Sequence, residues 1–150
     1  MKTLQQIFDE GLAHIRKQGG PCRLDLPEPV LDDGYRPVMM LVGRCTYRNG
    51  QGQACIVGGL IADADYDPAW DENDGTPAAE LAKSDEGRKA LLNAGIDVTQ
   101  SDVINLLSRM QGAHDIGPDD YIGPDNYMYQ FELAMRNVAK IEGLTYTEPA

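Results

Sequence analysis

The sequence is short of positive charge and of long apolar runs. Its 150 residues carry 13 Lys and Arg against 24 Asp and Glu, so the formal net charge at pH 7 is −11. Because proteins that bind nucleic acid hold its phosphates with a basic surface, this shortage argues against direct nucleic-acid binding. No apolar run reaches the roughly 18 residues that a transmembrane helix needs, and the mean hydropathy is −0.40. We therefore expect no membrane among the partners.

Cysteine is scarce too, and nucleotide-binding motifs are missing. The three cysteines, Cys22, Cys45 and Cys55, are odd in number and irregularly spaced, which fits reduced thiols better than a disulfide framework. The first residues lack the apolar stretch of a secretory signal. No Walker A, GxGxxG or GxSxG motif occurs. The sequence therefore predicts a cytoplasmic protein with no cofactor.

The charge that is present is concentrated in the middle of the chain. Residues 63–125 contain 15 acidic residues against four basic ones, whereas residues 1–62 contain six acids and seven bases. The middle segment therefore carries the whole net charge. Such segregation produces a long-range negative field that attracts a basic partner. An acidic surface that only keeps the protein soluble would have the same composition.

Apolar residues recur at helical spacing in four segments. The first follows Thr3, which has the spacing of a capping box with Gln6, and it ends at Gly19. The others run from Ala79 to Asn93, from Thr99 to Met110, and from an N-cap at Asp125 to Gly143. We expect an amphipathic helix in each segment.

A β-hairpin is predicted between the first two of these helices. Asn49-Gly50 is a turn sequence, and the flanking residues 44–48 and 53–57 are suited to strands. Nothing in the sequence reads as a repeat or as a linker between domains, and 150 residues suit one hydrophobic core. The predicted fold class is α+β, a single domain over residues 1–150 with about four helices around a small hairpin sheet.

The first acidic loop has carboxylates at regular spacing, which are Asp63, Asp65, Asp67, Asp71 and Asp74. A calcium-binding loop places its oxygen ligands at such positions. That loop also needs glycine at its sixth position, because the turn requires a positive φ, and Pro68 stands there. We interpret residues 63–78 as an acidic loop without calcium.

Two other kinds of site would use the cysteines and His114. Zinc needs about four ligands, and Cys45, Cys55 and His114 are the candidates, since the two cysteines can face each other across the predicted hairpin. A hydrolase needs a nucleophile and a base, for which Cys55 and His114 are candidates, with Asp115 or Asp119 to orient the imidazole. Because cysteines in strands usually only pack, we assign neither a metal site nor catalytic residues.

One run of residues resembles a family of small uncharacterised proteins from phages and prophages. It consists of Cys45-Thr46-Tyr47-Arg48, then Cys55, Gly58-Gly59-Leu60-Ile61, Asp63 and Tyr66-Asp67-Pro68. Residues 4–9, 110–115 and 138–144 are similar to the family as well. The resemblance implies a phage-type protein in the cytoplasm of a bacterial host, and it implies no particular activity.

The chain departs from that family at two places. Many relatives carry a further cysteine near the position of Gly59, and they have a shorter approach to the Cys-Tyr-Arg run than residues 21–42 provide here. Asp65 and Asp71 also lie outside the family pattern. A metal site shared with the family is therefore not expected.

Charge and resemblance together predict a phage-type acidic protein that inhibits a host factor with a basic surface. Its carboxylates would stand in for DNA phosphates and block a defence or nucleic-acid-binding enzyme, as an anti-CRISPR or anti-restriction protein does. Electrostatic attraction would raise the association rate, and buried aromatic anchors would supply affinity. The residues expected to contact the partner are Asp63, Asp65, Asp67, Trp70, Asp71, Glu72, Asp74, Asp119, Asp120 and Tyr121.

Two alternatives stay open. A small hydrolase that uses Cys55 and His114 would have an unusually reactive thiol. A structural or oligomerising accessory protein without catalysis would make contacts through apolar surface rather than through acidic loops. The oligomeric state is open as well.

Overall fold

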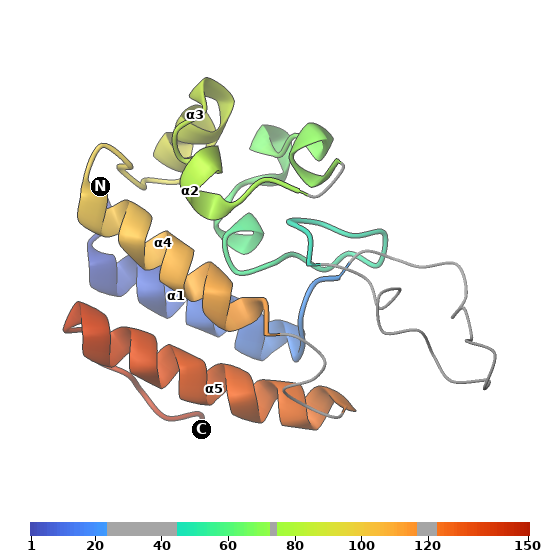
Figure 1. Ribbon diagram of the computed structural model, residues 1–150, viewed down its shortest axis with the longest axis vertical. Helices are drawn as coiled ribbons and strands as arrows, with labels where there is room; N and C mark the ends of the chain where they lie inside the picture. Colours follow the sequence, from blue (N-terminus) through green and yellow to red (C-terminus); the bar gives the residue numbers. More distant parts are fainter. Residues whose placement is uncertain (24–44, 73–74, 117–122) are drawn as a thin grey trace.

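The structure, a computed structural model, describes residues 1–23, 45–72, 75–116 and 123–150, without the side chains of residues 123–125. These residues form five α-helices and three short 3-10 helices (Figure 1). In chain order they are α1 (Leu4–Gln18), η2 (Gly58–Leu60), η3 (Asp63–Asp65), η4 (Pro68–Asp71), α2 (Ala78–Leu81), α3 (Asp85–Asn93), α4 (Ser101–His114) and α5 (Gly123–Glu142).

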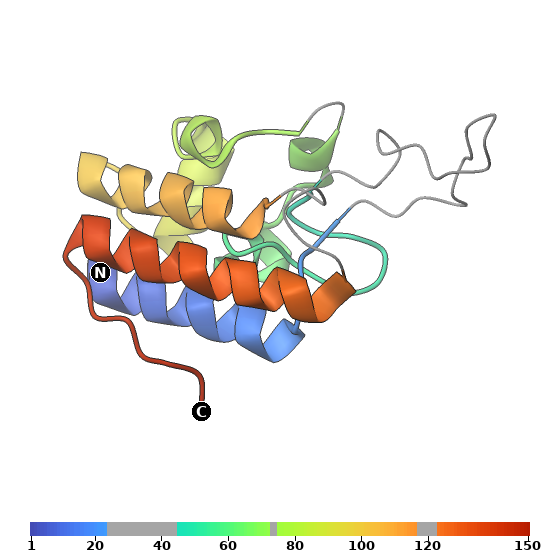
Figure 2. The ribbon, with the colours of Figure 1, turned by 60° about the horizontal axis from the view of Figure 1, so that its bottom comes forward.

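Three long helices make the body of the molecule. α1, α4 and α5 each contact the other two, and α5 runs opposite to α1 and α4 (Figure 1 and Figure 2). α2 packs on α4 and η2 packs on α1, so the short helices cover the side away from α5. The largest fully buried side chains include Ile7, Phe8, Leu106, Leu107, Tyr127 and Phe131. No helix in the described ranges combines the length and the apolar character needed to cross a membrane.

All four predicted helical segments are helical, although their ends differ. Thr3 Oγ1 accepts a hydrogen bond from the Gln6 N–H (3.2 Å) and Gln6 Oε1 accepts one from the Thr3 N–H (2.9 Å), which confirms the capping box. The predicted helix over 79–93 is divided in two, because Ser84 caps α3 by accepting from the Gly87 N–H (3.0 Å). α5 begins at Gly123, so the prediction of Asp125 as its N-cap is wrong.

The predicted fold class, α+β with a hairpin sheet, is wrong. The described residues contain no β-strand, and only isolated antiparallel bridges join Arg48 to Ala54 and Arg23 to Cys45. The turn itself forms, since the Asn49 N–H donates to the Gln53 carbonyl (3.3 Å). The part of the chain that the structure describes is therefore mainly helical.

Side chains from other parts of the chain form hydrogen bonds with the backbone groups around the predicted hairpin. Gln18 Oε1 accepts from the Ala54 N–H (2.9 Å), while its Nε2 donates to the Ala54 carbonyl (3.0 Å). Asp71 accepts from the N–H groups of Tyr47 and Arg48. Because a buried backbone group needs only one good partner, these contacts satisfy the chain without a sheet.

The C-terminal tail, residues 144–150, lies along α1 and α5 (Figure 2). The Gln5 amide both donates to the Thr145 carbonyl (3.0 Å) and accepts from its N–H (2.8 Å). Tyr146 donates to Glu132 on α5, and Arg16 of α1 pairs with the same carboxylate. Burial would raise the pKa of Glu132, but the hydrogen bonds from Arg16 and Tyr146 outweigh it and hold the pKa below its usual value. The tail is thus fixed to two helices.

Candidate functional site

Asp71 joins the acidic loop to Tyr47 and Arg48, the two residues before the turn that begins at Asn49. Its Oδ1 accepts from the Tyr47 N–H (2.7 Å), and its Oδ2 accepts from the Arg48 N–H (3.1 Å) and the Tyr66 hydroxyl (2.5 Å). A carboxylate that accepts several hydrogen bonds from buried donors stabilises the fold. Asp71 was predicted to contact a partner protein, but both of its carboxylate oxygens accept hydrogen bonds within the fold.

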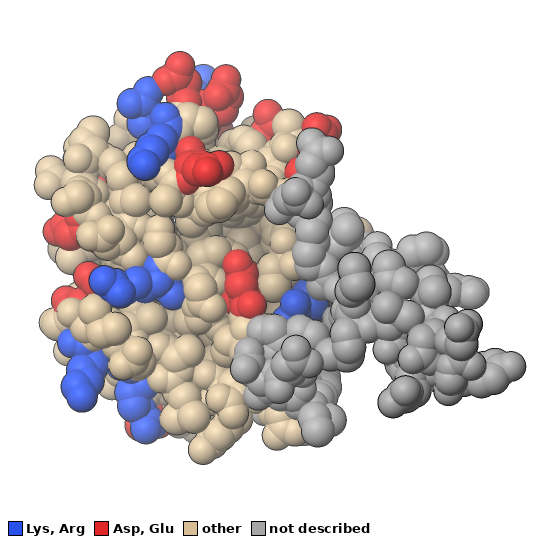
Figure 3. Space-filling view, in the orientation of Figure 1, with Lys and Arg blue, Asp and Glu red and all other residues tan. Residues whose placement is uncertain are grey.

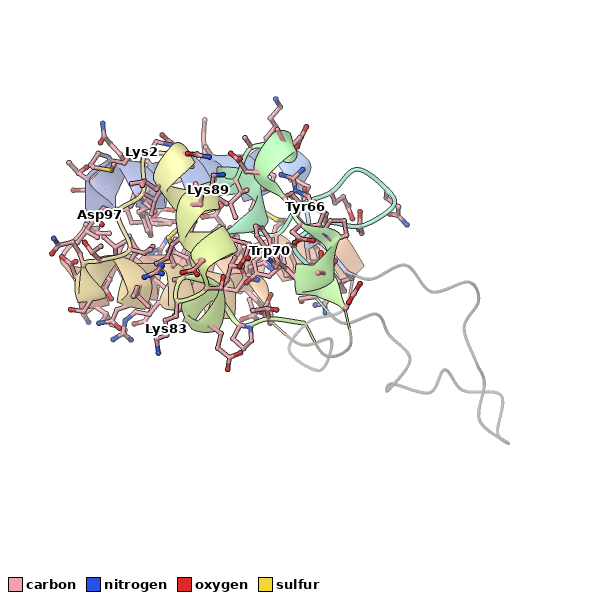
Figure 4. The ribbon with its side chains drawn as sticks, turned by 90° about the horizontal axis from the view of Figure 1, so that it is seen from above. Lys2, Tyr66, Trp70, Lys83, Lys89 and Asp97 are labelled. Carbon is pink, nitrogen blue, oxygen red and sulfur yellow. The ribbon has the colours of Figure 1, made fainter. Side chains whose placement is uncertain are left out.

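Trp70 was predicted to anchor a partner, and the structure places it in the core. Only 7% of its surface is exposed. Its ring makes edge contacts with the rings of Tyr47 (6.1 Å between centroids) and Tyr66 (5.8 Å). Figure 4 looks onto this end of the molecule and shows Trp70 on the side of η4 that faces α3, with Tyr66 nearby. In this conformation Trp70 cannot enter a pocket on another protein.

The remaining predicted contact residues divide into two groups. Asp63 pairs with Arg48 and is otherwise exposed, Asp65 accepts from the Asn93 amide (3.1 Å), and Asp67 caps η4 through the Ala69 N–H (2.9 Å). Glu72 is exposed. The predicted residues that lie outside the described part are Asp74, Asp119, Asp120 and Tyr121.

Exposed and half-exposed carboxylates gather over η3, η4, α2 and α3, at the end of the molecule away from α5. We call this surface the acidic end, and its members are Asp63, Asp65, Asp67, Glu72, Glu80, Asp85 and Glu86. Figure 3 shows acidic side chains crowded there, with a smaller number of basic ones among them. Glu80, Asp85 and Glu86 were not predicted, although their polar positions on the helix expected over 79–93 were a usable signal.

A second polar cluster forms where α4 ends. His114 is fully buried, and its Nε2 accepts a hydrogen bond from the Cys22 N–H (3.0 Å). Its Nδ1 lies 2.7 Å from Asp115 Oδ1. Because Nε2 accepts from an amide, a neutral His114 carries its proton on Nδ1 and donates it to Asp115. Both ring nitrogens are thus occupied.

Asp115 collects hydrogen-bond donors from α4 and from residue 45. Besides His114, the Gln111 amide donates to its Oδ1 (2.8 Å), and the Cys45 thiol hydrogen-bonds to it. Burial together with the Asp115 carboxylate raises the pKa of Cys45 to about 12. Cys45 therefore stays a thiol at neutral pH and makes a poor nucleophile.

The cluster contains residue types that bind metal ions, but the ring proton of His114 lies on the nitrogen that would have to bind the metal. Ligand atoms of Cys45, His114 and Asp115 all lie within 4.8 Å of one another, and Cys55 is not part of this group. A metal on His114 Nδ1 would require the ring proton on Nε2, where the Cys22 N–H already donates. The geometry therefore fits a hydrogen-bonded node that fixes Cys22 and Cys45 to the end of α4.

Cys55, the predicted nucleophile, is fully buried. Its sulfur accepts from the Gly58 N–H (3.2 Å), and burial raises its pKa well above the usual value. Within the described residues no hydrogen bond joins Cys55 to His114. The structure thus brings together the predicted base and its orienting carboxylate, His114 and Asp115, but not the predicted nucleophile.

A small polar cavity of about 220 Å³ lies beside the cluster. Its lining includes Cys45, Tyr47, Cys55, Asp71 and Asp115. Sites for drug-sized ligands usually have at least about 300 Å³ and mainly apolar walls. This cavity can accommodate water or a very small polar molecule.

The cysteine thiols are expected to be unreactive in the folded protein. With Cys22 and Cys55 buried and the pKa of Cys45 near 12, a disulfide reagent at pH 8 should react roughly 100-fold more slowly with the native protein than with the unfolded one. The rate at which the absorbance of the released reagent thiolate rises, with and without urea, measures this difference. A native thiol that reacts as fast as an unfolded one would contradict the assignment, and Cys55→Ala would show whether Cys55 is responsible.

None of the three comparisons with known proteins finds a match, whether with family models, curated proteins or solved structures.

Proposed function

We propose that this protein is a non-catalytic binding protein that presents its acidic end to a basic surface on a partner protein. One observation carries the proposal: the carboxylates of the acidic end gather on one side of the fold, and most of them have no buried partner that they must hold in place. By contrast, the candidate catalytic groups Cys55 and His114 are buried and occupied by internal hydrogen bonds.

The charge distribution supports attraction of a strongly basic partner. The segment that supplies the acidic end also carries the whole net charge of the chain, and a negative field of this kind speeds the encounter with a positive surface. Nucleic-acid-binding enzymes offer such a surface, because they must neutralise phosphates. A protein that places carboxylates on that surface blocks nucleic-acid binding and is not itself a substrate of the enzyme.

The resemblance to phage and prophage proteins supports a finer proposal. The partner would be a host defence or nucleic-acid-binding enzyme, and the inhibition would be stoichiometric, as with anti-CRISPR or anti-restriction proteins. The carboxylates would occupy the positions of DNA phosphates. Such a complex weakens steeply with salt, since its attraction depends on charges at its solvent-exposed edge.

The test is capture from bacterial lysate with an N-terminally tagged protein, at low and high salt. The informative variant combines Glu72→Gln, Glu80→Gln and Glu86→Gln, three exposed members of the acidic end. We expect the wild type to retain a basic nucleic-acid enzyme at low salt, and the variant to retain at least about 10-fold less. The captured enzyme should lose DNA binding in the complex.

The control variant removes the same amount of charge elsewhere, by Asp9→Asn, Glu10→Gln and Asp102→Asn on α1 and α4. It should capture the partner as the wild type does. Asp71 is left unchanged in both variants, because its loss would perturb folding as well as charge. Equal capture by both variants, or capture that ignores salt, would contradict the proposal.

A further inference from the structure

The groove between α1 and α5 has an occupant in this structure, which is the C-terminal tail. Ala13 and Leu133 are among the residues that line the groove on the side of the helices, and Tyr146 and Glu148 line it on the side of the tail. About 910 Å³ of space lies between them. None of residues 144–150 is fully buried. The tail therefore lies along the groove without filling it (Figure 2).

Side chains of α1 hold the backbone of the tail. The Gln5 amide bonds to both backbone groups of Thr145, and Arg16 Nη2 donates to the Thr147 carbonyl (2.7 Å). Both threonines are exposed, whereas Tyr146 between them is half-buried, which is the alternation of an extended chain on a surface. Main-chain hydrogen bonds give affinity for an extended segment, and side chains that point inward give selectivity.

Two arginines and a glutamate of the groove contact the side chains of the tail. The guanidinium carbons of Arg16 and Arg136 lie 5.5 Å and 5.2 Å from the centre of the Tyr146 ring. The Tyr146 hydroxyl donates to Glu132, and Arg136 also pairs with Glu148. A tyrosine thus gains cation–π contacts and a hydrogen bond, and a carboxylate two positions later gains an ion pair. The groove is complementary to a Tyr-x-Glu segment.

The contacts of the tail are of a kind that can open while the helices stay folded. The side chains of Arg136 and Glu148 are 52% and 67% exposed, so their ion pair holds the tail weakly. Gly143, with a φ of +67°, turns the chain out of α5 before the tail begins. Within the described residues, the tail supplies none of the buried side chains through which α1, α4 and α5 pack.

We propose that the groove between α1 and α5 is a recognition site for an extended peptide segment that carries a tyrosine followed two positions later by a glutamate, and that the tail occupies this site reversibly. The bound tail shows which chemistry the groove accepts. Because the tail is attached to α5, its local concentration is on the order of 1 mM, so an external segment must compete with it. This inference does not rest on the proposed function, since it uses a surface away from the acidic end.

Fluorescence anisotropy of a labelled synthetic peptide with the sequence of residues 144–150 tests the site. The full-length double variant Tyr146→Ala, Glu148→Ala loses the side-chain contacts of its own tail and keeps every groove residue of α1 and α5. It should bind the peptide at least about 10-fold more tightly than the wild type, whose tail competes. Circular dichroism should show the helix content of the wild type, because neither residue is in the core.

The matched control protein is Thr145→Ala, Thr147→Ala, because these residues contact the groove through their backbone only. It should bind the peptide as weakly as the wild type does. A control peptide that carries Tyr146→Ala and Glu148→Ala should bind the double variant at least about 10-fold more weakly than the original peptide.

Three results would overturn the proposal. If the double variant binds the peptide no better than the wild type, the tail does not compete for a peptide site. If both peptides bind the double variant equally, the groove does not recognise the Tyr-x-Glu chemistry. If the double variant loses helix content, the tail is part of the core and cannot leave it reversibly.

Discussion

Replacing His114 by leucine is expected to lower the free energy of unfolding by about 3 kcal/mol, because it leaves buried polar groups without partners. Leucine fills much of the volume but cannot accept from the Cys22 N–H, and Asp115 loses one of its donors. Urea unfolding followed by circular dichroism measures the loss.

A second substitution at the same position separates hydrogen bonding from packing. His114→Gln keeps a side-chain oxygen that can accept from the Cys22 N–H, so it should lose about half as much stability as the leucine variant. If the two variants unfold at the same urea concentration, the hydrogen bond to Cys22 contributes nothing measurable, and the cluster at the end of α4 is not a structural node.

Gly58→Ala is expected to destabilise the protein by a similar amount, about 3 kcal/mol, through overpacking. A Cβ at this position would overlap the carbonyl oxygen of Tyr47, which also accepts from the Cys55 N–H (3.1 Å). Backbone atoms cannot move aside as the end of a side chain can. The substitution should therefore push Tyr47 away from Cys55, and thermal unfolding should show the loss.

The matched control is Gly112→Ala in α4, where a Cβ meets nothing within 4 Å. Alanine restricts the unfolded chain and favours helix, so this variant should gain up to about 1 kcal/mol. Opposite signs for the two glycines are the expected result. A neutral Gly58→Ala would mean that residues 47 and 58 are less closely packed than the structure describes.

The helices were predictable because their signals are local. Thr3, Gln6 and Gly19 act within one or two turns of the helix they bound, and the capping box and the C-cap at Gly19 are both formed. Apolar spacing in α1, α4 and α5 matches the residues that they bury. The start at Gly123, the break that the Ser84 cap makes within residues 79–93, and the 3-10 helices η2, η3 and η4 were missed.

The hairpin failed because distant side chains compete for its backbone. Gln18 holds Ala54 across 36 residues, and Asp71 holds Tyr47 and Arg48 across more than 20. A pattern of alternating residues around Asn49-Gly50 contains no trace of these partners. The residues on the two sides of the turn do form one antiparallel bridge. Contacts with residues distant in the sequence prevent the bridge from extending into a hairpin.

The candidate site was predictable in part. The adjacency of His114 and Asp115 in the sequence indicated their pairing, whereas the approach of Cys45 and the exclusion of Cys55 depend on the fold. Trp70 and Asp71 were assigned to a surface because they lie in an acidic stretch, yet one is buried and the other binds backbone N–H groups. Composition indicates the charge of a segment but not which of its members face outward.

The bridge between Arg23 and Cys45 has a consequence for how stability depends on the length of the chain. The Thr46 N–H also donates to the Cys22 carbonyl (3.2 Å), so the chain returns beside the point where it left. Once two ends are held together, doubling the length of the chain between them costs only about 0.6 kcal/mol of closure entropy. By this term alone, the free energy of unfolding depends little on the number of residues between Arg23 and Cys45.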